Sequence, residues 1–225
     1  GKDKDFDFQK AYNPYDFSGL RACEARVWSF FRTFDKGMDK YKKHIMGDAS
    51  EEPMPLYIIP DRKVSLADVR EGMRNHYEGT ELSMTNDPGA GVYKVPYRWR
   101  PMTFKSEGRE YFNERAIATQ QTGFVLIAQM RSWLPDAVGG ILWFGVDDAN
   151  TAVLTPMYTS ITEIPECYRR GNGSMTEFSW TSAFWIHNWV ANMAYNRYEP
   201  MIRDIRPVQK ELEDSYVDLV KNTDA

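Results

Sequence analysis

The sequence predicts an α+β protein in which helices cover an antiparallel sheet. Three short apolar runs lie in the middle of the chain, at residues 122–130, 140–147 and 151–158. The segments on both sides of these runs carry apolar residues at helical spacing instead. The order of helices, strands and helices therefore favours a layered fold with a sheet built from neighbouring strands.

The three apolar runs are expected to form a meander. The short "DDAN" turn joins the second run to the third, as in a hairpin, and a longer loop joins the first run to the second. The first two runs barely alternate, which predicts that both of their faces are covered. Pro156 cannot donate a ladder hydrogen bond, so the third run is expected at a sheet edge or a bulge.

Two main helices are expected before the strands. Ser18 can cap the first, and Ser65 with Asp68 forms a capping box that begins the second. Gly79 is a plausible end for the second helix. The expected buried stripe of the first helix consists of Leu20, Cys23, Val27, Phe30, Phe31 and Phe34.

Further helices are expected after the strands. Residues 181–195 are apolar nearly all round, which predicts a deeply buried helix. In the last helical segment, Pro200 suits a first turn, whereas Pro207 should kink or divide the helix. Its expected contact stripe consists of Val208, Leu212, Tyr216 and Leu219.

The domain organisation follows from these elements. Residues 1–18 are expected to form an extended arm, and residues 19–225 the main body. Residues 85–112 are expected to form a long loop, and loops of that length are usually functional or disordered. Its aromatic residues, Tyr93, Tyr97 and Trp99, argue against disorder, and they could stack on a peptide or a sugar. A standalone binding module without catalysis is therefore one possible function.

Composition excludes several classes of partner. The chain has 225 residues and a net charge of −4, whereas a nucleic-acid-binding protein is usually basic. No run approaches the ~18 apolar residues that a membrane span requires.

Gly1 could be left by removal of a tag, in which case the natural start and any targeting signal lie upstream. A cytoplasmic and an exported parent protein both remain open.

Charged and amide side chains directly precede the first apolar run. They are Asn113, Glu114, Arg115, Gln120 and Gln121. They could be solvated loop residues, with a Glu–Arg pair tying the loop. They could instead converge on a site at the end of the sheet, where the fixed donor fork of arginine would hold a carboxylate or steady an oxyanion.

Three other groups of residues could carry chemistry. Asp147 and Asp148 could act as an acid–base pair, although carboxylates at such a position more often form the turn. His76 and Glu78 do not share a helix face, so a zinc-peptidase arrangement is absent, and they are expected at a helix end or a cleft wall. His187 lies in the apolar helix and is expected to be a core histidine. No metal site is predicted.

The two cysteines have different surroundings. Cys23 falls on the predicted buried stripe, which suits an inert apolar residue. Cys167 has Arg169 and Arg170 nearby, which could depress its pKa, but no histidine is close in sequence. A self-sufficient hydrolase that uses Cys167 or the two adjacent aspartates is a third reading.

Five segments in the same order resemble one known family. They read "NHYEGT", "NDPGAG", "NERAIATQQTGFVLIAQMR", "LPDAVGGILWFGVDDANTAVLTPMY" and "SAFWIHNWVANMAYNRY". From about Cys23 to the end of the last helix, the chain is similar to the C-terminal part of the dipeptidase A family of bacterial cysteine dipeptidases. These are N-terminal nucleophile hydrolases, more distantly related to penicillin V acylase and bile salt hydrolase.

The resemblance implies a four-layer αββα sandwich and hydrolysis of unblocked dipeptides without a metal or an organic cofactor. It also implies a cysteine at the mature N-terminus, whose own α-amine is the general base. This chain begins with Gly1, and neither Cys23 nor Cys167 occupies the position of that nucleophile. We therefore expect a C-terminal fragment, inactive alone, that is completed by an upstream half of the same protein and forms a homo-oligomer.

The resemblance also implies roles for individual residues. An arginine lies against the nucleophile in the related acylases, and Arg115 is the candidate for that role. Asn113, Glu114 and Gln121 are candidate substrate-positioning groups. On charge matching rather than on the resemblance, Glu78 could face the free α-amine of a dipeptide, and Asp148 is a further candidate for binding substrate.

Overall fold

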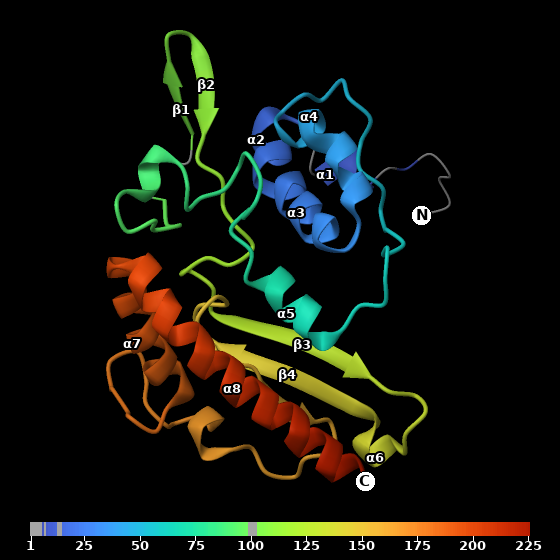
Figure 1. Cartoon of the computed structure of the whole chain (residues 1–225), viewed down its shortest axis with the longest axis vertical. Helices are drawn as coiled ribbons and strands as arrows, with labels where there is room; N and C mark the ends of the chain where they lie inside the picture. Colours follow the sequence, from blue (N-terminus) through green and yellow to red (C-terminus); the bar gives the residue numbers. More distant parts are fainter. Residues whose placement is uncertain (1–5, 7, 13–14, 99–102) are drawn as a thin grey trace. The chain divides into compact units, whose positions relative to one another are not determined.

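A computed structural model of the chain describes residues 6, 8–12, 15–98 and 103–225, which divide into two units (Figure 1). The first unit comprises described residues of Gly1–Leu82 and Arg98–Ile117, and the second comprises Ser83–Tyr97 and Ala118–Ala225. The expected main body is thus distributed over both units. Among the helices of the described residues, none combines the length and the apolar character needed to cross a membrane.

The first unit is mainly helical. Its elements are α1 (Phe8–Tyr12), α2 (Phe17–Gly19), the π-helical turn η1 (Leu20–Glu24), α3 (Ala25–Phe34), the 3₁₀ helix η2 (Lys36–Tyr41), α4 (Lys42–Ile45), α5 (Leu66–Met73), β1 (Thr103–Ser106) and β2 (Arg109–Phe112). The described part of the expected arm is therefore partly helical, because it contains α1 and the start of α2.

The π-helical turn shifts the buried face of the first predicted helix. A π turn adds one residue to the helix, so the side that faces the core moves by one position along the sequence. Trp28 is consequently buried, and its indole nitrogen donates to the carbonyl of Met38 at 2.8 Å. Val27, which the regular spacing placed in the stripe, is exposed. Leu20 and Phe34 at the two ends are buried as expected.

The capping box at Ser65 is confirmed, but the helix that it begins ends early. The Ser65 hydroxyl accepts from the Asp68 backbone, and the Asp68 carboxylate accepts from the Ser65 backbone. Helix α5 ends at Met73, well before Gly79. Tyr77 has a φ of 65°, and a helix cannot continue through that left-handed conformation.

The segment expected as a long loop contains a β-hairpin at its end. Strands β1 and β2 are antiparallel, and the stacked rings of Phe104 and Tyr111 lie 5.3 Å apart across them. Glu107 and Gly108 between the strands both have positive φ, as a type I′ turn requires. The loop prediction was therefore wrong for residues 103–112. Trp99, one of its aromatic residues, lies outside the described residues.

The second unit holds the predicted meander. Its elements are the 3₁₀ helix η3 (Pro88–Ala90), β3 (Phe124–Met130), α6 (Asp136–Gly139), β4 (Gly140–Val146), β5 (Thr155–Tyr158), the 3₁₀ helix η4 (Glu166–Tyr168), α7 (Ala183–Asn196) and α8 (Tyr198–Asp224). The strands are antiparallel in the order β3-β4-β5. Pro156 lies on the edge strand β5 opposite Trp143, as expected.

Helix α8 covers one face of this sheet (Figure 1). Tyr158 pairs with Ile141, so both lie on the covered face, and the Tyr158 hydroxyl donates to the Val220 carbonyl of α8 at 3.3 Å. Polar residues of α8 also face inward, because the buried Glu213 accepts from the Leu154 backbone at 3.0 Å. The expected apolar contact stripe was wrong in consequence, since Val208, Leu212 and Leu219 are exposed.

Helices α8 and α7 also differ from what the sequence predicted. Helix α8 is continuous through Pro207, so the proline does not divide it. Helix α7 is not deeply buried as a whole, because it packs through small residues, Ala191 and Ala194, and leaves Trp189 and Met193 exposed. The apolar composition of α7 therefore does not predict how much of the helix is buried.

The other face of the sheet is largely uncovered on β3. Phe124, Leu126 and Met130 alternate along that strand on one face, together with Leu142 of β4. Their side chains are exposed, by 61% for Phe124 and 73% for Met130. The expectation that both faces of β3 are covered is therefore wrong within the described residues. We call these four residues the open sheet face.

Candidate active site

A strained turn after α5 organises the candidate site in the first unit. The Asn75 side-chain oxygen accepts from the Ser29 hydroxyl at 2.6 Å and from the Tyr77 backbone at 2.7 Å. Tyr77 is fully buried although its φ is positive. Such a backbone conformation costs about 1–3 kcal/mol for a residue other than glycine, so the surrounding contacts must maintain it.

The turn contacts the polar segment that precedes β3. The Tyr77 hydroxyl donates to the backbone carbonyl of Arg115 at 2.9 Å. Two sequence segments that were candidates on separate grounds, around Glu78 and around Arg115, therefore lie together in the first unit. Burial strongly raises the pKa of Tyr77, so the hydroxyl keeps the proton that it donates.

Glu78 presents a fixed negative charge at this turn. One carboxylate oxygen accepts from the His76 backbone at 2.6 Å, and the other lies 3.1 Å from Nδ1 of the His76 ring. Burial favours a higher pKa for Glu78, but the hydrogen bonds from His76 outweigh it and lower the pKa below its ordinary value. The side chain is about half exposed, so an anionic carboxylate is available to a ligand.

Glu114 and Arg115 do not form the Glu–Arg pair considered from the sequence. Glu114 pairs instead with Arg21, and both side chains are largely buried. The carboxylate of Glu114 therefore ties its segment to the helical region of the first unit. Asn113 and Arg115 are half-buried beside it.

Asp148 lies in the second unit and has a structural environment. It is fully buried, and its carboxylate accepts from the Thr151 backbone at 2.9 Å, the Thr151 hydroxyl at 2.9 Å and the Tyr195 hydroxyl at 3.0 Å. These bonds correspond to the turn role that the sequence favoured. Asp147 has a positive φ, and burial raises its pKa. Gln121, also in this unit, is exposed.

His187 is half-buried, and both of its ring nitrogens are hydrogen-bonded within the second unit. Its Nδ1 lies 2.8 Å from the Ala183 carbonyl, to which it donates, and its Nε2 accepts from the Val153 backbone at 3.3 Å. Burial lowers its pKa, which favours this neutral form. Because His187 is the single histidine of the second unit, Cys167 has no free imidazole base there.

Further observations concern the self-sufficient hydrolase, a metal site and the aromatic loop. Cys23 and Cys167 are free thiols and belong to different units. The described residues contain no group of three or more His, Cys, Asp or Glu side chains that could hold a metal ion. Tyr93, from the aromatic loop, packs its ring 5.7 Å from the Arg197 guanidinium within the second unit.

Sequence reasoning missed the residues that hold the turn and the polar segment before β3. Ser29, Arg21 and Tyr77 carry no motif of their own, because their contacts span from 38 to 93 positions along the chain. The one local signal was Asn75 directly before the turn, since asparagine side chains commonly bond to backbone two residues further on.

Comparison with known proteins places the chain in a family of peptidases. The model of peptidase family C69 matches residues 1–211. The chain belongs to peptidase family C69, and the resemblance to the dipeptidase A family is thereby confirmed.

Curated relatives are bacterial and longer than this chain. Probable dipeptidase B of Lactococcus lactis subsp. lactis (strain IL1403) is 27% identical over 205 residues, which are 88% of this chain and 37% of the relative. A probable dipeptidase of Salmonella dublin is 27% identical over 154 residues, 68% of this chain and 30% of the relative. Dipeptidase A of Lactobacillus helveticus is 22% identical over 193 residues, 85% and 33% respectively. The chain thus spans about a third of their length.

Proposed function

We propose that this protein is the C-terminal part of a cysteine dipeptidase of the N-terminal nucleophile type, whose nucleophile lies on an upstream segment. Membership of peptidase family C69 and the dipeptidase names of its relatives support hydrolysis of dipeptides. The chain covers about a third of those relatives, which leaves room in the complete protein for a further sheet and a terminal cysteine.

The observation that carries this proposal is the open sheet face. In an αββα sandwich each sheet has helices on one side and the second sheet on the other. Here α8 covers one side, while Phe124, Leu126, Met130 and Leu142 are exposed on the other. A second sheet from the upstream segment would bury these side chains.

The open sheet face should cause the isolated chain to self-associate, because exposed contiguous apolar surface favours association in water. Phe124→Lys is expected to shift the chain towards monomer in sedimentation velocity. Val208→Lys, which changes an exposed apolar residue of α8, is the matched control and should leave the distribution unchanged. A wild-type chain that stays monomeric at all concentrations would contradict the role of this face.

In the proposed reaction, the α-amine of the cysteine takes the thiol proton and the thiolate attacks the peptide carbonyl. The C–N bond then breaks as the leaving amine takes that proton, and water hydrolyses the thioester to regenerate the thiol. Arg115 lies against the reacting centre and steadies the negative charge that develops on the oxygen. Asn113 positions the substrate beside it. The anionic carboxylate of Glu78 pairs with the free α-ammonium group of the dipeptide, which explains a preference for unblocked substrates.

Glu78→Gln should reduce that preference selectively. The substitution keeps the size of the side chain and removes the charge, so the ratio of kcat/KM for a free dipeptide to that for its N-acetyl derivative should fall about tenfold, equivalent to ~1.4 kcal/mol. Glu81→Gln is the control, since Glu81 is exposed nearby and pairs with Lys42 at 3.0 Å. An unchanged ratio in Glu78→Gln would sink this assignment.

The function itself is tested by assaying hydrolysis of unblocked dipeptides with the chain alone and with the upstream half co-expressed. Activity in the combined sample only is the expected result. Activity of the isolated chain would mean that a nucleophile is already present, and Cys167→Ala would then be the first variant to examine.

A further inference from the structure

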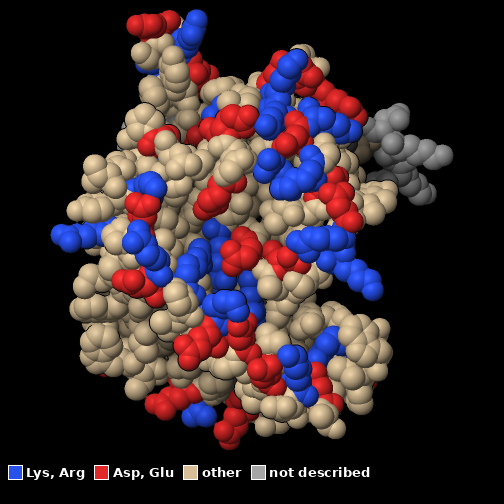
Figure 2. Space-filling view, in the orientation of Figure 1, with Lys and Arg blue, Asp and Glu red and all other residues tan. Residues whose placement is uncertain are grey.

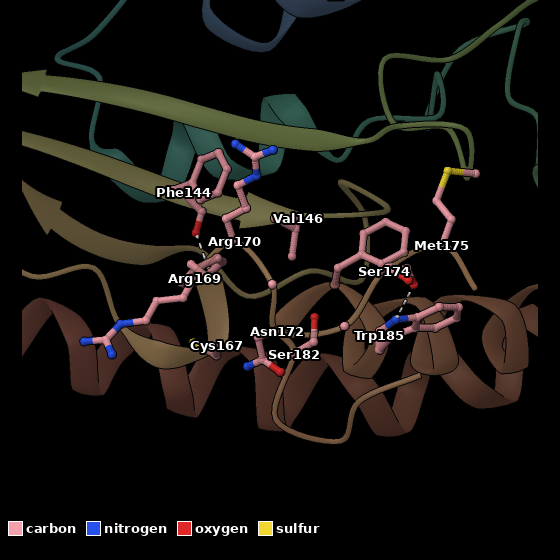
Figure 3. Close-up of a pocket in the computed structure, with 14 residues that line it drawn as sticks. Phe144, Val146, Cys167, Arg169, Arg170, Asn172, Ser174, Met175, Ser182 and Trp185 are labelled. Atoms are coloured by element: carbon pink, nitrogen blue, oxygen red, sulfur yellow. Dashed lines mark hydrogen bonds between the residues drawn. The ribbon is translucent and has the colours of Figure 1, made fainter. Parts of the chain in front are cut away.

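A pocket in the second unit adjoins the open sheet face, since Phe144 stands opposite Leu126 in the sheet and its ring lies 6.1 Å from that of Phe124. It has a volume of about 520 Å³ and is bounded by β4, by the loop from Cys167 to Met175 and by the start of α7 (Figure 3). Phe144 and Val146 of β4 form one apolar wall, and Phe184 and Trp185 of α7 form another. Sites for small organic ligands typically have about 300–1,000 Å³ and apolar walls with a few polar groups.

The loop that frames the pocket is held by its own hydrogen bonds. The Asn172 amide donates to the carbonyls of Glu166 at 3.0 Å and Thr181 at 3.1 Å, and its oxygen accepts from the Ser179 hydroxyl at 2.7 Å. Gly171 and Gly173 on either side of Asn172 both have positive φ, which a residue with a side chain rarely adopts. The pocket is therefore formed before any ligand arrives.

The same loop holds Trp185, which belongs to the second apolar wall. The Trp185 indole nitrogen donates to the carbonyls of Ser174 at 3.1 Å and Glu177 at 3.0 Å. A Cβ at Gly173 would meet the Trp185 ring at 3.0 Å, so the glycine allows the ring and the loop to approach this closely. The indole is thus fixed at the pocket wall in one orientation.

Two adjacent arginines of the loop differ in where their charges lie. Arg170 extends beside Phe144, whereas Arg169 points away (Figure 3). Arg169 donates to the Ile164 carbonyl at 3.0 Å and lies 3.7 Å from Glu163. Within the described part of the chain, the Arg170 guanidinium has no hydrogen bond or ion pair. Its charge is therefore available to a ligand in the pocket.

We propose that this pocket binds a small apolar carboxylate. The carboxylate pairs with the donor fork of Arg170, and an aromatic or aliphatic group lies against Phe144, Val146 and Trp185. A single arginine beside apolar walls matches one negative charge, because a second charge on the ligand would remain unpaired in an apolar surrounding.

The test uses 3-phenylpropionate as the probe and its neutral amide as the matched ligand. Calorimetric titration of the chain should show saturable binding of the acid and at least about tenfold weaker binding of the amide, because a charge-assisted hydrogen bond is lost. Arg170→Gln should weaken binding of the acid by about the same factor, Arg170→Lys by less, and Arg169→Gln not measurably.

A second readout locates the ligand. Cys167 lines the pocket, so the acid should slow alkylation of Cys167 relative to Cys23, as measured by peptide mass spectrometry. Absence of saturable binding, equal binding of acid and amide, or equal loss in Arg169→Gln and Arg170→Gln would each overturn the proposal. So would a lack of Cys167 protection in this chain.

Discussion

Arg115→Ala is expected to lower kcat/KM for an unblocked dipeptide by about 100- to 1,000-fold in the complete enzyme, the usual loss when a donor to a developing oxyanion is removed. The loss should lie mainly in kcat, because the proposed interaction strengthens as negative charge develops in the transition state. Steady-state kinetics of the co-expressed halves, with thermal unfolding of each variant, would measure it.

Tyr77→Phe tests the support of the Arg115 backbone separately from the role of the Arg115 side chain. This variant removes the hydroxyl that donates to the Arg115 carbonyl but keeps the ring in the core. It should reduce kcat by a smaller factor than Arg115→Ala and lower stability by about 1–3 kcal/mol, because the buried carbonyl loses its donor. If Arg115→Ala reduced stability and left kcat within twofold of wild type, Arg115 would be a structural residue only.

The parts of the fold that the sequence predicted depend on local signals. The capping box at Ser65 and Asp68 satisfies backbone groups within four residues, and the meander follows from short apolar runs separated by turns. Pro156 identified the edge strand because a proline has no backbone donor. Each of these rules operates over a few residues, so distant contacts could not change the outcome.

The predictions that failed depend on contacts between residues far apart in the sequence. The π-helical turn at Leu20–Glu24 moved the buried position from Val27 to Trp28, and no pattern in the sequence announced the added residue. In α8 the chain buries Gln209 and Glu213 in place of the apolar stripe, because both side chains bond to backbone of the β4–β5 connection. Hydrophobic periodicity cannot identify a helix face that is buried through hydrogen bonds.

In the candidate site too, local signals were predictable from the sequence and long-range contacts were not. The sequence indicated Glu78 and Arg115 as residues with suitable chemistry, but it gave no reason to connect them. The connection is the Tyr77 hydroxyl, and it depends on a left-handed backbone at a buried tyrosine. Tyrosine is disfavoured in that conformation, so the sequence does not predict a left-handed turn at this position. Backbone strain of this kind concentrates at functional sites, which agrees with the proposed role of the turn.

The mixed surface charge fits a small polar substrate better than a polyanion. Figure 2 shows basic and acidic side chains interspersed over the visible face, and the net charge of the chain is −4. A nucleic-acid-binding surface would instead gather Lys and Arg on one side. The proposed recognition of a dipeptide needs only a few local charges, such as those assigned to Glu78 and Arg115.

Asp148→Ala is expected to destabilise the chain by about 3 kcal/mol or more, because buried donors left without an acceptor cost about 1–3 kcal/mol each. The donors are the Thr151 backbone, the Thr151 hydroxyl and the Tyr195 hydroxyl. Burial and the adjacent carboxylate raise the pKa of Tyr195, so its hydroxyl remains a donor throughout the accessible pH range. Equilibrium unfolding in urea measures the loss.

The size of this effect distinguishes the two roles that the sequence allowed for Asp148. Asp148→Asn keeps one acceptor oxygen, so it should cost less than Asp148→Ala, and Tyr195→Phe should reduce the penalty of Asp148→Ala in a double-mutant cycle. A turn residue gives this order of stabilities with kcat in the complete enzyme nearly unchanged. An acid–base residue gives the opposite result, because Asp148→Asn would abolish turnover while stability stayed within about 0.5 kcal/mol of wild type.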